Sequence, residues 1–201
     1  NLSFNARRIV SDIRRIGPMS RATLARTLSI TPSTVTRLTV QLIDAGLLSE
    51  HDDPHRKPQK GYPAKLLHLN PCGLYTAGVY IDPDRIMSCI STLSGDILAQ
   101  DELVVPDRSF DAIMSAAGSR VKKLIKDVDV DIADMAGCGV SYPGRYSQDP
   151  TRVLRIRQFK DWPKVNIRND LSPYFGMPVQ HLNDAKAASL AELYHGVAHN
   201  L

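Results

Sequence analysis

The chain has 201 residues, of which 43% are hydrophobic and 23% are charged, the composition of an ordinary globular protein. No apolar run is long enough to span a bilayer and no charged start leads into an apolar stretch, so we expect a cytoplasmic protein without a signal peptide or a membrane partner. The cysteines, Cys72, Cys89 and Cys138, are odd in number and form no CxxC pair, which argues against a disulfide framework and against a metal site; we expect them to be small buried residues.

Positive charge is concentrated in the first third of the chain. Residues 1–70 contain eleven Lys and Arg against five Asp and Glu, a net charge of +6, whereas residues 71–201 contain fourteen against sixteen, a net charge of −2. A cationic segment followed by a nearly neutral one predicts two domains with different partners. The first domain is suited to a polyanion.

The first two helices are predicted from apolar spacing and from capping residues. A helix over residues 4–16 has an inward stripe at helical spacing, namely Ala6, Ile9, Ile13 and Ile16. Gly17-Pro18 ends this helix because neither residue favours a helix interior. Ser20 is then a suitable N-cap for a short helix over residues 21–28.

A third helix follows a tight connection. Thr31 caps it and Pro32 occupies its first position, where a missing N–H does no harm. Its apolar stripe is expected to consist of Val35, Leu38, Leu42 and Ala45. After Gly46, the segments LLSE (47–50) and AKLLHL (64–69) have the pattern of a strand hairpin. Two short helices, a tight turn and a hairpin predict a winged helix-turn-helix over residues 1–70.

Candidate DNA contacts lie on the third helix and on the hairpin loop. With its apolar stripe inward, the helix exposes a set near its N-terminal end, the part that enters a major groove: Ser33, Thr34, Thr36 and Arg37. Of these, Arg37 suits a guanine edge. A second set suits phosphates: Arg21, Arg56, Lys57 and Lys60. We therefore expect operator DNA as a partner; the alternative is a protein-interaction module with a solvated basic loop.

Residues 71–201 have the pattern of a second, strand-rich domain. We predict three strands, a helix, two further strands and a closing helix, in the order 74–81, 85–92, 97–105, 110–126, 135–144, 177–184 and 185–195. The chain is thus expected to combine α+β and α/β architecture.

Several segments, in their order along the chain, resemble the ROK family of transcriptional repressors, open reading frames and sugar kinases. They are the helix-turn-helix, PAKLLHLNP (63–71), GVSYPG (139–144), Trp162 and MPVQHLNDAKAASLAELYHG (177–196). The most specific part is PVQHLNDAKAASLAE, which is similar to the family's PV…NDAN…A…E signature. The resemblance implies an actin-like ATPase (ribonuclease H-like) fold, of which residues 71–201 are the first lobe. We expect the chain to be truncated before the second lobe.

The resemblance also implies which residues hold a sugar. In the family's kinases the aspartate of the Asn-Asp pair is the catalytic base and the asparagine bonds a neighbouring hydroxyl; these positions are Asp184 and Asn183 here. Weaker matches are Gly144, in the Pro-Gly turn, and Gln158, four residues before Trp162. The residue types alone leave an alternative, in which Asn183-Asp184 only caps the helix that follows.

The phosphate loop of the family's kinases is replaced in this chain. Those kinases begin their first hairpin with Asp-x-Gly-Gly-Thr-Lys, and the counterpart here is Tyr-Ile-Asp-Pro-Asp-Arg (80–85). Tyr80 replaces the acidic residue, Asp82 and Pro83 replace the glycines, and Asp84 replaces the threonine. Two carboxylates would repel phosphates and Pro83 removes a donor, so we expect an ordinary hairpin turn, no ATP binding and no catalytic residue.

These observations lead us to expect a transcriptional regulator, a repressor of carbohydrate-utilisation genes whose operator binding responds to a sugar or sugar derivative. The resemblance implies a homodimer or higher homo-oligomer, no cofactor in this chain, and a structural zinc in a second lobe beyond residue 201. Two alternatives stay open. One is a ROK-type sugar kinase with a DNA-binding domain, and the other is a ligand-blind repressor controlled by a protein partner.

Overall fold

The computed structural model describes residues 2–53, 65–146, 153–155 and 171–196. The chain forms two compact units, Asn1–Leu74 and Tyr75–Leu201, and each is described by itself. None of the helices in the described ranges is long and apolar enough to cross a membrane.

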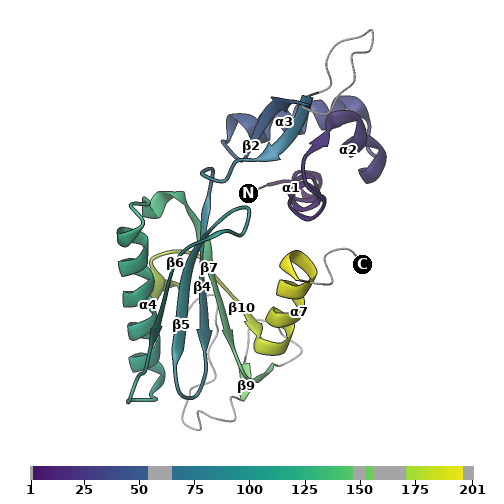
Figure 1. The fold of residues 1–201 in the computed structure, drawn as a ribbon. Helices are drawn as coiled ribbons and strands as arrows, with labels where there is room; N and C mark the ends of the chain where they lie inside the picture. Colours follow the sequence, from purple (N-terminus) through teal and green to yellow (C-terminus); the bar gives the residue numbers. More distant parts are fainter. Residues whose placement is uncertain (1, 54–64, 147–152, 156–170, 197–201) are drawn as a thin grey trace. The chain divides into compact units, whose positions relative to one another are not determined.

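The first unit contains the predicted helices and hairpin (Figure 1). Its elements are α1 (Phe4–Ile16), β1 (Met19–Ser20), α2 (Arg21–Leu28), α3 (Pro32–Asp44), β2 (Leu48–Asp52) and β3 (Lys65–Leu69). The strands form an antiparallel sheet in the order β1-β3-β2. Strand β1, which the sequence does not predict, pairs Met19 with Leu67 and so ties the segment after α1 to the hairpin.

Hydroxyl side chains begin α2 and α3, as the sequence predicts. Ser20 Oγ accepts a hydrogen bond from the Thr23 N–H at 3.1 Å, and Thr31 Oγ1 accepts one from the Thr34 N–H at 3.3 Å. Between the helices, Ser29 has a φ of 54°, the left-handed conformation that makes the turn tight. The winged helix-turn-helix is therefore confirmed.

An apolar core joins the three helices to the sheet. Its most deeply buried side chains include Ile9, Leu24, Val35, Leu42 and Leu67. The prediction of a core position is wrong for two residues. Ile16 is 51% exposed at the end of α1, and Ala45 is exposed because α3 ends one residue before it. Thr39 is buried in α3 instead, since its hydroxyl has hydrogen-bond partners on both sides.

His68, in β3, contains a buried polar atom. Its Nε2 is shielded from solvent and has no hydrogen-bond partner among the described residues. Its ring lies edge-on to the ring of His51 in β2, with the centroids 4.9 Å apart. Burial lowers the pKa of His68 from 6.5, and the nearby His51 lowers it further. The folded unit therefore takes up a proton at His68 less readily than the unfolded chain.

We predict that the first unit loses stability as the pH falls below 6.5, the unfolded pKa of His68. Because the folded pKa is the lower one, the stabilisation is complete above that pH and declines below it. An NMR titration of the His68 ring measures the pKa, and urea unfolding at about pH 7.5 and about pH 5.5 measures the consequence. His68→Leu should weaken the pH dependence, while the control His51→Gln should move the His68 pKa back toward 6.5. A His68 pKa of 6.5 or above in the folded chain would contradict the prediction.

The second unit is a five-stranded sheet with a long helix on one face (Figure 1). Its elements are β4 (Tyr75–Ile81), β5 (Ile86–Thr92), β6 (Ile97–Leu103), α4 (Phe110–Asp127), the 3₁₀ turn η1 (Ile132–Asp134), β7 (Met135–Tyr142), β8 (Arg145–Tyr146), β9 (Val153–Arg155), α6 (Ser172–Phe175), β10 (Val179–Asn183) and α7 (Asp184–His195). The strand order is β10-β7-β4-β5-β6. The first three of these strands are parallel, and β4, β5 and β6 are antiparallel. The predicted strands and helices are confirmed, whereas η1, α6 and the β8–β9 pair were not predicted.

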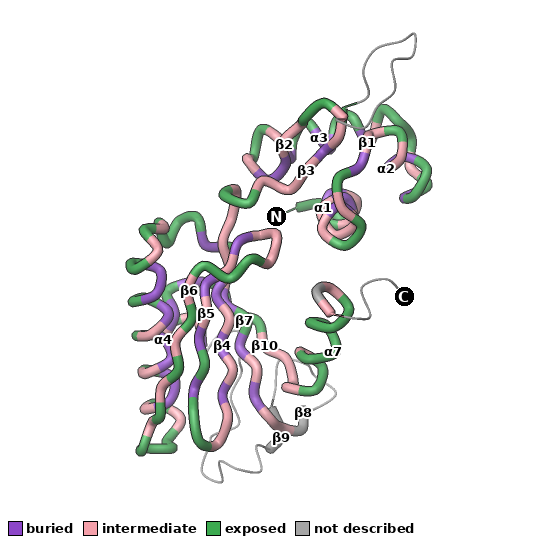
Figure 2. The backbone as a smooth tube through the Cα atoms, in the orientation of Figure 1, coloured by how far each residue is buried: buried purple, intermediate pink, exposed green. Residues whose placement is uncertain are grey.

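The face of the sheet under α4 holds the core of this unit (Figure 2). Alternate residues of β4 and β5 point toward the helix: Ala77, Val79, Ile81, Ile86 and Ile90. The intervening residues, such as Tyr80, Met87 and Cys89, belong to the opposite face, where α7 lies beside β10 and β7.

The cysteines differ in exposure, contrary to the expectation that all of them are buried. Cys138 lies in the core, where burial raises the pKa of its thiol to about 12, so the thiol stays protonated at neutral pH. Cys89 is half-buried, but Cys72 is exposed because it lies in the turn that connects β3 with β4.

Gly118 lets α4 approach α6 closely. A Cβ at this position would overlap with the backbone oxygen of Tyr174. We predict that Gly118→Ala destabilises the second unit by about 1–3 kcal/mol, although alanine favours helix formation. Urea unfolding followed by far-UV circular dichroism measures this change.

Gly139→Ala is the matched control for this substitution. Among the described residues its Cβ would meet only the Ala77 backbone oxygen, at an ordinary 3.9 Å, so stability should hardly change. Equal losses for the two variants would show that the contact with α6 is not the cause.

Candidate functional site

The outward face of α3 is the candidate nucleic-acid surface of the first unit. Val35, Leu38, Thr39 and Leu42 are buried on one side of the helix. The residues opposite them, three and four positions apart, are all exposed and form what we call the outward stripe: Ser33, Arg37, Val40 and Asp44. Thr36 and Gln41 are exposed on its two flanks.

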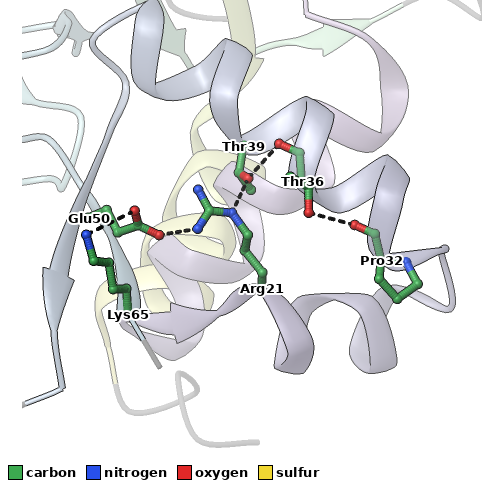
Figure 3. Close-up of polar contacts among 6 residues, drawn as sticks. All are labelled: Arg21, Pro32, Thr36, Thr39, Glu50 and Lys65. Atoms are coloured by element: carbon green, nitrogen blue, oxygen red, sulfur yellow. Dashed lines mark hydrogen bonds and ion pairs between the residues drawn. The ribbon is translucent and has the colours of Figure 1, made fainter. Parts of the chain in front are cut away.

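Hydroxyl groups in the first turns of α3 are engaged within the helix. Thr31 Oγ1 lies 3.1 Å from Ser33 Oγ and 2.8 Å from Thr34 Oγ1. Thr36 Oγ1 donates to the Pro32 carbonyl oxygen at 2.9 Å (Figure 3). Ser33 and Thr36 are on the surface, and Thr34 is half-exposed. Part of their hydrogen-bonding capacity is therefore used by the helix, which leaves less of it for bases.

Arg37 occupies the middle of the outward stripe. It is exposed and forms no hydrogen bond or ion pair with another residue in the described ranges. All its N–H donors are thus available on a helix held by the core, and a guanidinium in this state can form the paired bonds to guanine O6 and N7. Its base contact stays a prediction.

Two exposed residues of α3, Val40 and Gln41, escaped the sequence prediction. The signal was present, because the helical period that turns Arg37 outward turns Val40 outward as well. Val40 is apolar, however, and an apolar residue is not an obvious candidate for a DNA contact. Its exposure had to be known from the structure before it became a candidate.

Arg21 is bonded inside the first unit. Its Nε donates to Thr39 Oγ1 at 2.9 Å, and its Nη1 pairs with Glu50 Oε1 (Figure 3). Lys65 Nζ lies 3.9 Å from the other oxygen of Glu50. The guanidinium therefore connects the start of α2 with α3 and β2, and among the described contacts Nη2 is left for a phosphate.

The predicted phosphate contact of Arg21 stays a prediction. The remaining predicted phosphate contacts, Arg56, Lys57 and Lys60, lie outside the described residues, as does the predicted sugar contact Gln158.

The second unit has a cavity of about 1480 Å³ on the face of the sheet away from α4. Strands of the sheet form its floor and α7 forms one wall, with Tyr80, Cys89, Ser141, Leu182 and Asp184 among the lining residues. Of the described residues, no lysine, arginine or histidine lines it, whereas Asp101, Glu102 and Asp184 do. An anionic ligand would meet no opposite charge in this lining.

The turn between β4 and β5 lies where the kinase phosphate loop is replaced. The Asp82 N–H donates to the Arg85 carbonyl at 2.9 Å, which closes an ordinary hairpin turn. The Tyr80 hydroxyl donates to Asp82 Oδ2 at 3.3 Å. Burial raises the pKa of Tyr80, and the charges of Asp82 and Asp184 raise it further. The turn and the Asn-Asp pair are therefore near enough to interact electrostatically.

Asn183 and Asp184 have different surroundings. Asn183 is the N-cap of α7, because its Oδ1 accepts from the Ala185 N–H at 3.0 Å. Its Nδ2 donates to the Gly144 carbonyl at 3.1 Å, which joins two of the predicted sugar contacts. Asp184 Oδ1 also accepts from the Ala185 N–H, at 2.8 Å, and Asp184 is one of the residues that line the cavity. Capping is thus shown for Asn183, and the sugar contacts of Gly144, Asn183 and Asp184 stay predictions.

The fold and these surfaces define a two-part class of protein, a winged helix-turn-helix followed by an actin-like lobe. Residues 76–201 match the ROK family, and residues 2–55 match the MarR family. The chain belongs to the ROK family, as the resemblance of its motifs implies.

Proteins similar to this chain include an uncharacterized protein and named transcriptional regulators. The chain is 31% identical over 194 residues to the uncharacterized protein y4fQ of Sinorhizobium fredii, covering 95% of this chain and 48% of that protein. It is 23% identical to the DNA-binding transcriptional dual regulator NagC of Escherichia coli, covering 97% of this chain and 47% of NagC. It is 20% identical to the xylose repressor of Bacillus subtilis, covering 98% and 50%. The chain spans about half the length of the curated relatives it matches.

Solved structures share the fold. A ROK family transcriptional regulator described as a homolog of the E. coli MLC protein superposes with a TM-score of 0.75 at 22% identity, covering 95% of this chain and 48% of that one. The ROK hexokinase from Thermus thermophilus superposes with a TM-score of 0.53 at 22% identity, covering 63% of this chain and 41% of that one.

We predict that Asn183→Ala destabilises the second unit by about 1–2 kcal/mol, because it removes both the cap of α7 and the bond to Gly144. Asp184→Asn should have little effect on stability, because Asn183 still caps the helix. Urea unfolding followed by far-UV circular dichroism compares the stabilities of the two variants. Ser189→Ala, which removes one exposed hydroxyl bond within α7, is the control. A larger loss of stability for Asp184→Asn than for Asn183→Ala would show that Asp184, and not Asn183, is the residue that stabilises α7.

Proposed function

We propose that the protein is a sequence-specific DNA-binding repressor of carbohydrate-utilisation genes, whose operator affinity is changed by a sugar or sugar derivative. The observation that carries the proposal is the outward stripe of α3, in which Arg37 stands exposed, with no bond to another described residue, on a helix fixed by the core. The net charge of +6 on residues 1–70 supports a polyanionic partner. The names of the relatives, a DNA-binding regulator and a xylose repressor, agree with this function.

The sugar would bind at the end of the cavity where Asp184 lies. A carboxylate accepts hydrogen bonds from adjacent hydroxyl groups, which are what a sugar presents. Asp184 lines the cavity, and the Asn183 amide, fixed by Gly144 and Ala185, holds the turn beside it. This arrangement supports recognition of a polyol.

The kinase alternative is less well supported by the same region. A general base acts only when an electrophile is held in line with the attacking hydroxyl. Here Tyr80, Asp82 and Pro83 form a hairpin turn in place of a glycine-rich phosphate loop, and the described lining of the cavity contains no basic side chain. We infer that Asp184 binds its ligand without serving as the base of a phosphoryl transfer.

Repression would be relieved by a shift between two conformations of a homodimer. The sugar would favour the form in which the two winged helices are not at the spacing of the operator half-sites. A difference in sugar affinity worth about 1–3 kcal/mol between the two forms is enough to change operator occupancy.

We predict that the chain selects a defined DNA site from a random pool and that one member of a sugar panel changes its affinity in a gel shift. Arg37→Ala should lose about 1–3 kcal/mol on the selected site and become less selective, because the guanidinium reads a base. Arg15→Ala is the control, because it removes the same charge from an exposed position in α1. This variant should keep the selectivity. Asp184→Asn should bind the site normally and lose the sugar response.

Each part of the proposal has its own contradicting outcome. Absence of any selected site would reject the DNA-binding function. A selected site that no sugar affects would favour the ligand-blind alternative. Hydrolysis of ATP that depends on a sugar and on Asp184 would restore the kinase alternative.

A further inference from the structure

Val40 is an apolar side chain in the middle of a polar surface. It is 44% exposed, and its companions in the outward stripe of α3 are Ser33, Arg37 and Asp44. The apolar side of the helix is complete without it, because Val35, Leu38 and Leu42 are buried opposite. Helix stability does not explain the residue either, since a β-branched side chain loses rotamer freedom in a helix.

The neighbours of Val40 determine what it would meet in a major groove. Arg37 lies three positions earlier on the same stripe, and Gln41 is exposed on the adjoining flank. Neither side chain is bonded to another residue in the described part of the chain. Thr36, in contrast, directs its hydroxyl donor to Pro32 at 2.9 Å (Figure 3). Among the described residues, the middle of this surface therefore offers a guanidinium, an amide and one apolar group.

Each of these groups has a distinct complement on a base edge. A guanidinium pairs with guanine O6 and N7, and a glutamine amide pairs with adenine N6 and N7. The one apolar group that a base pair exposes in the major groove is the C5-methyl of thymine. Adenine and thymine share a base pair, so an A·T pair beside the guanine of Arg37 would offer a complement both to Val40 and to Gln41.

We propose that Val40 is a specificity-determining residue that recognises a thymine methyl group, with Gln41 on the adenine edge. This inference rests on the proposed DNA-binding function. In this proposal the bases are recognised mainly by Arg37, Val40 and Gln41 rather than by the hydroxyl residues at the start of α3.

Deoxyuridine, which is thymine without its methyl group, tests the proposal directly. The full chain is first used to select its site from random DNA, and each thymine of that site is then replaced singly by deoxyuridine. At one thymine per half-site, the replacement should weaken binding by about three- to tenfold, the effect of losing one buried methyl contact. Val40→Ala should bind the thymine and deoxyuridine sites equally well.

Two controls separate the contact from a general loss of folding. Ile16→Ala, which truncates an apolar residue 51% exposed in α1, should keep the preference for thymine. Circular dichroism should show an intact helix content for Val40→Ala, because alanine is the better helix former.

The outcomes distinguish this inference from the function on which it rests. Failure to select any site would reject the DNA-binding function itself. A selected site that tolerates deoxyuridine at every thymine would overturn the role of Val40 while leaving DNA binding in place. A preference for thymine that survives in Val40→Ala would assign the methyl contact to another residue.

Discussion

The direction in which α3 faces depends on a guanidinium bonded inside the first unit. Arg21 donates to the buried hydroxyl of Thr39 and pairs with Glu50 of β2. Without Arg21, the partners left among the described residues would be the Thr36 carbonyl for Thr39 and the more distant Lys65 for Glu50. The apolar core sets how close the helix lies, while this directional network resists its rotation. The exposure of the outward stripe is therefore a consequence of the apolar core and of this hydrogen-bond network together.

An equivalent constraint in the second unit is the parallel pairing of β4, β7 and β10. Parallel neighbours end at the same edge of a sheet, which is where ligands bind in open α/β structures. Tyr80 lies opposite Ser141, and Asn183 lies opposite Tyr142, so three loops that are distant in sequence meet there. The bond from Asn183 to Gly144 joins two of these loops. The cavity edge is therefore a consequence of strand register.

The Asn-Asp pair shows how one sequence motif can serve both the fold and a ligand. Asn183 uses its amide for the cap of α7 and for the Gly144 turn, whereas Asp184 is the member of the pair that lines the cavity. In the proposed function Asn183 therefore stabilises the fold and Asp184 binds the ligand. A fold shared with kinases is then used to recognise a sugar. The hairpin turn at Tyr80 to Arg85 is the feature on which that distinction depends.

Most of the secondary structure could be predicted because its signals are local. Ser20 and Thr31 each accept a hydrogen bond from the backbone N–H three residues further on, and the strands of the predicted hairpins pair antiparallel. The exposure of Ile16 and Cys72 could not be predicted, because periodicity does not say where a neighbouring element stops covering a surface. The family signature located Asn183-Asp184, but it did not show that Asn183 caps the helix while Asp184 lines the cavity.

Contacts between distant residues account for the rest. Arg21 meets partners 18 and 29 residues away, and Asn183 meets Gly144 across 39 residues. Val40 became a surface candidate only when the packing of α3 showed which side was already full. Caps, turns and alternation are fixed by neighbours along the chain, so residue order is enough to infer them. The bonds that orient α3 and join the loops of the cavity arise from folding, because no local pattern specifies their partners.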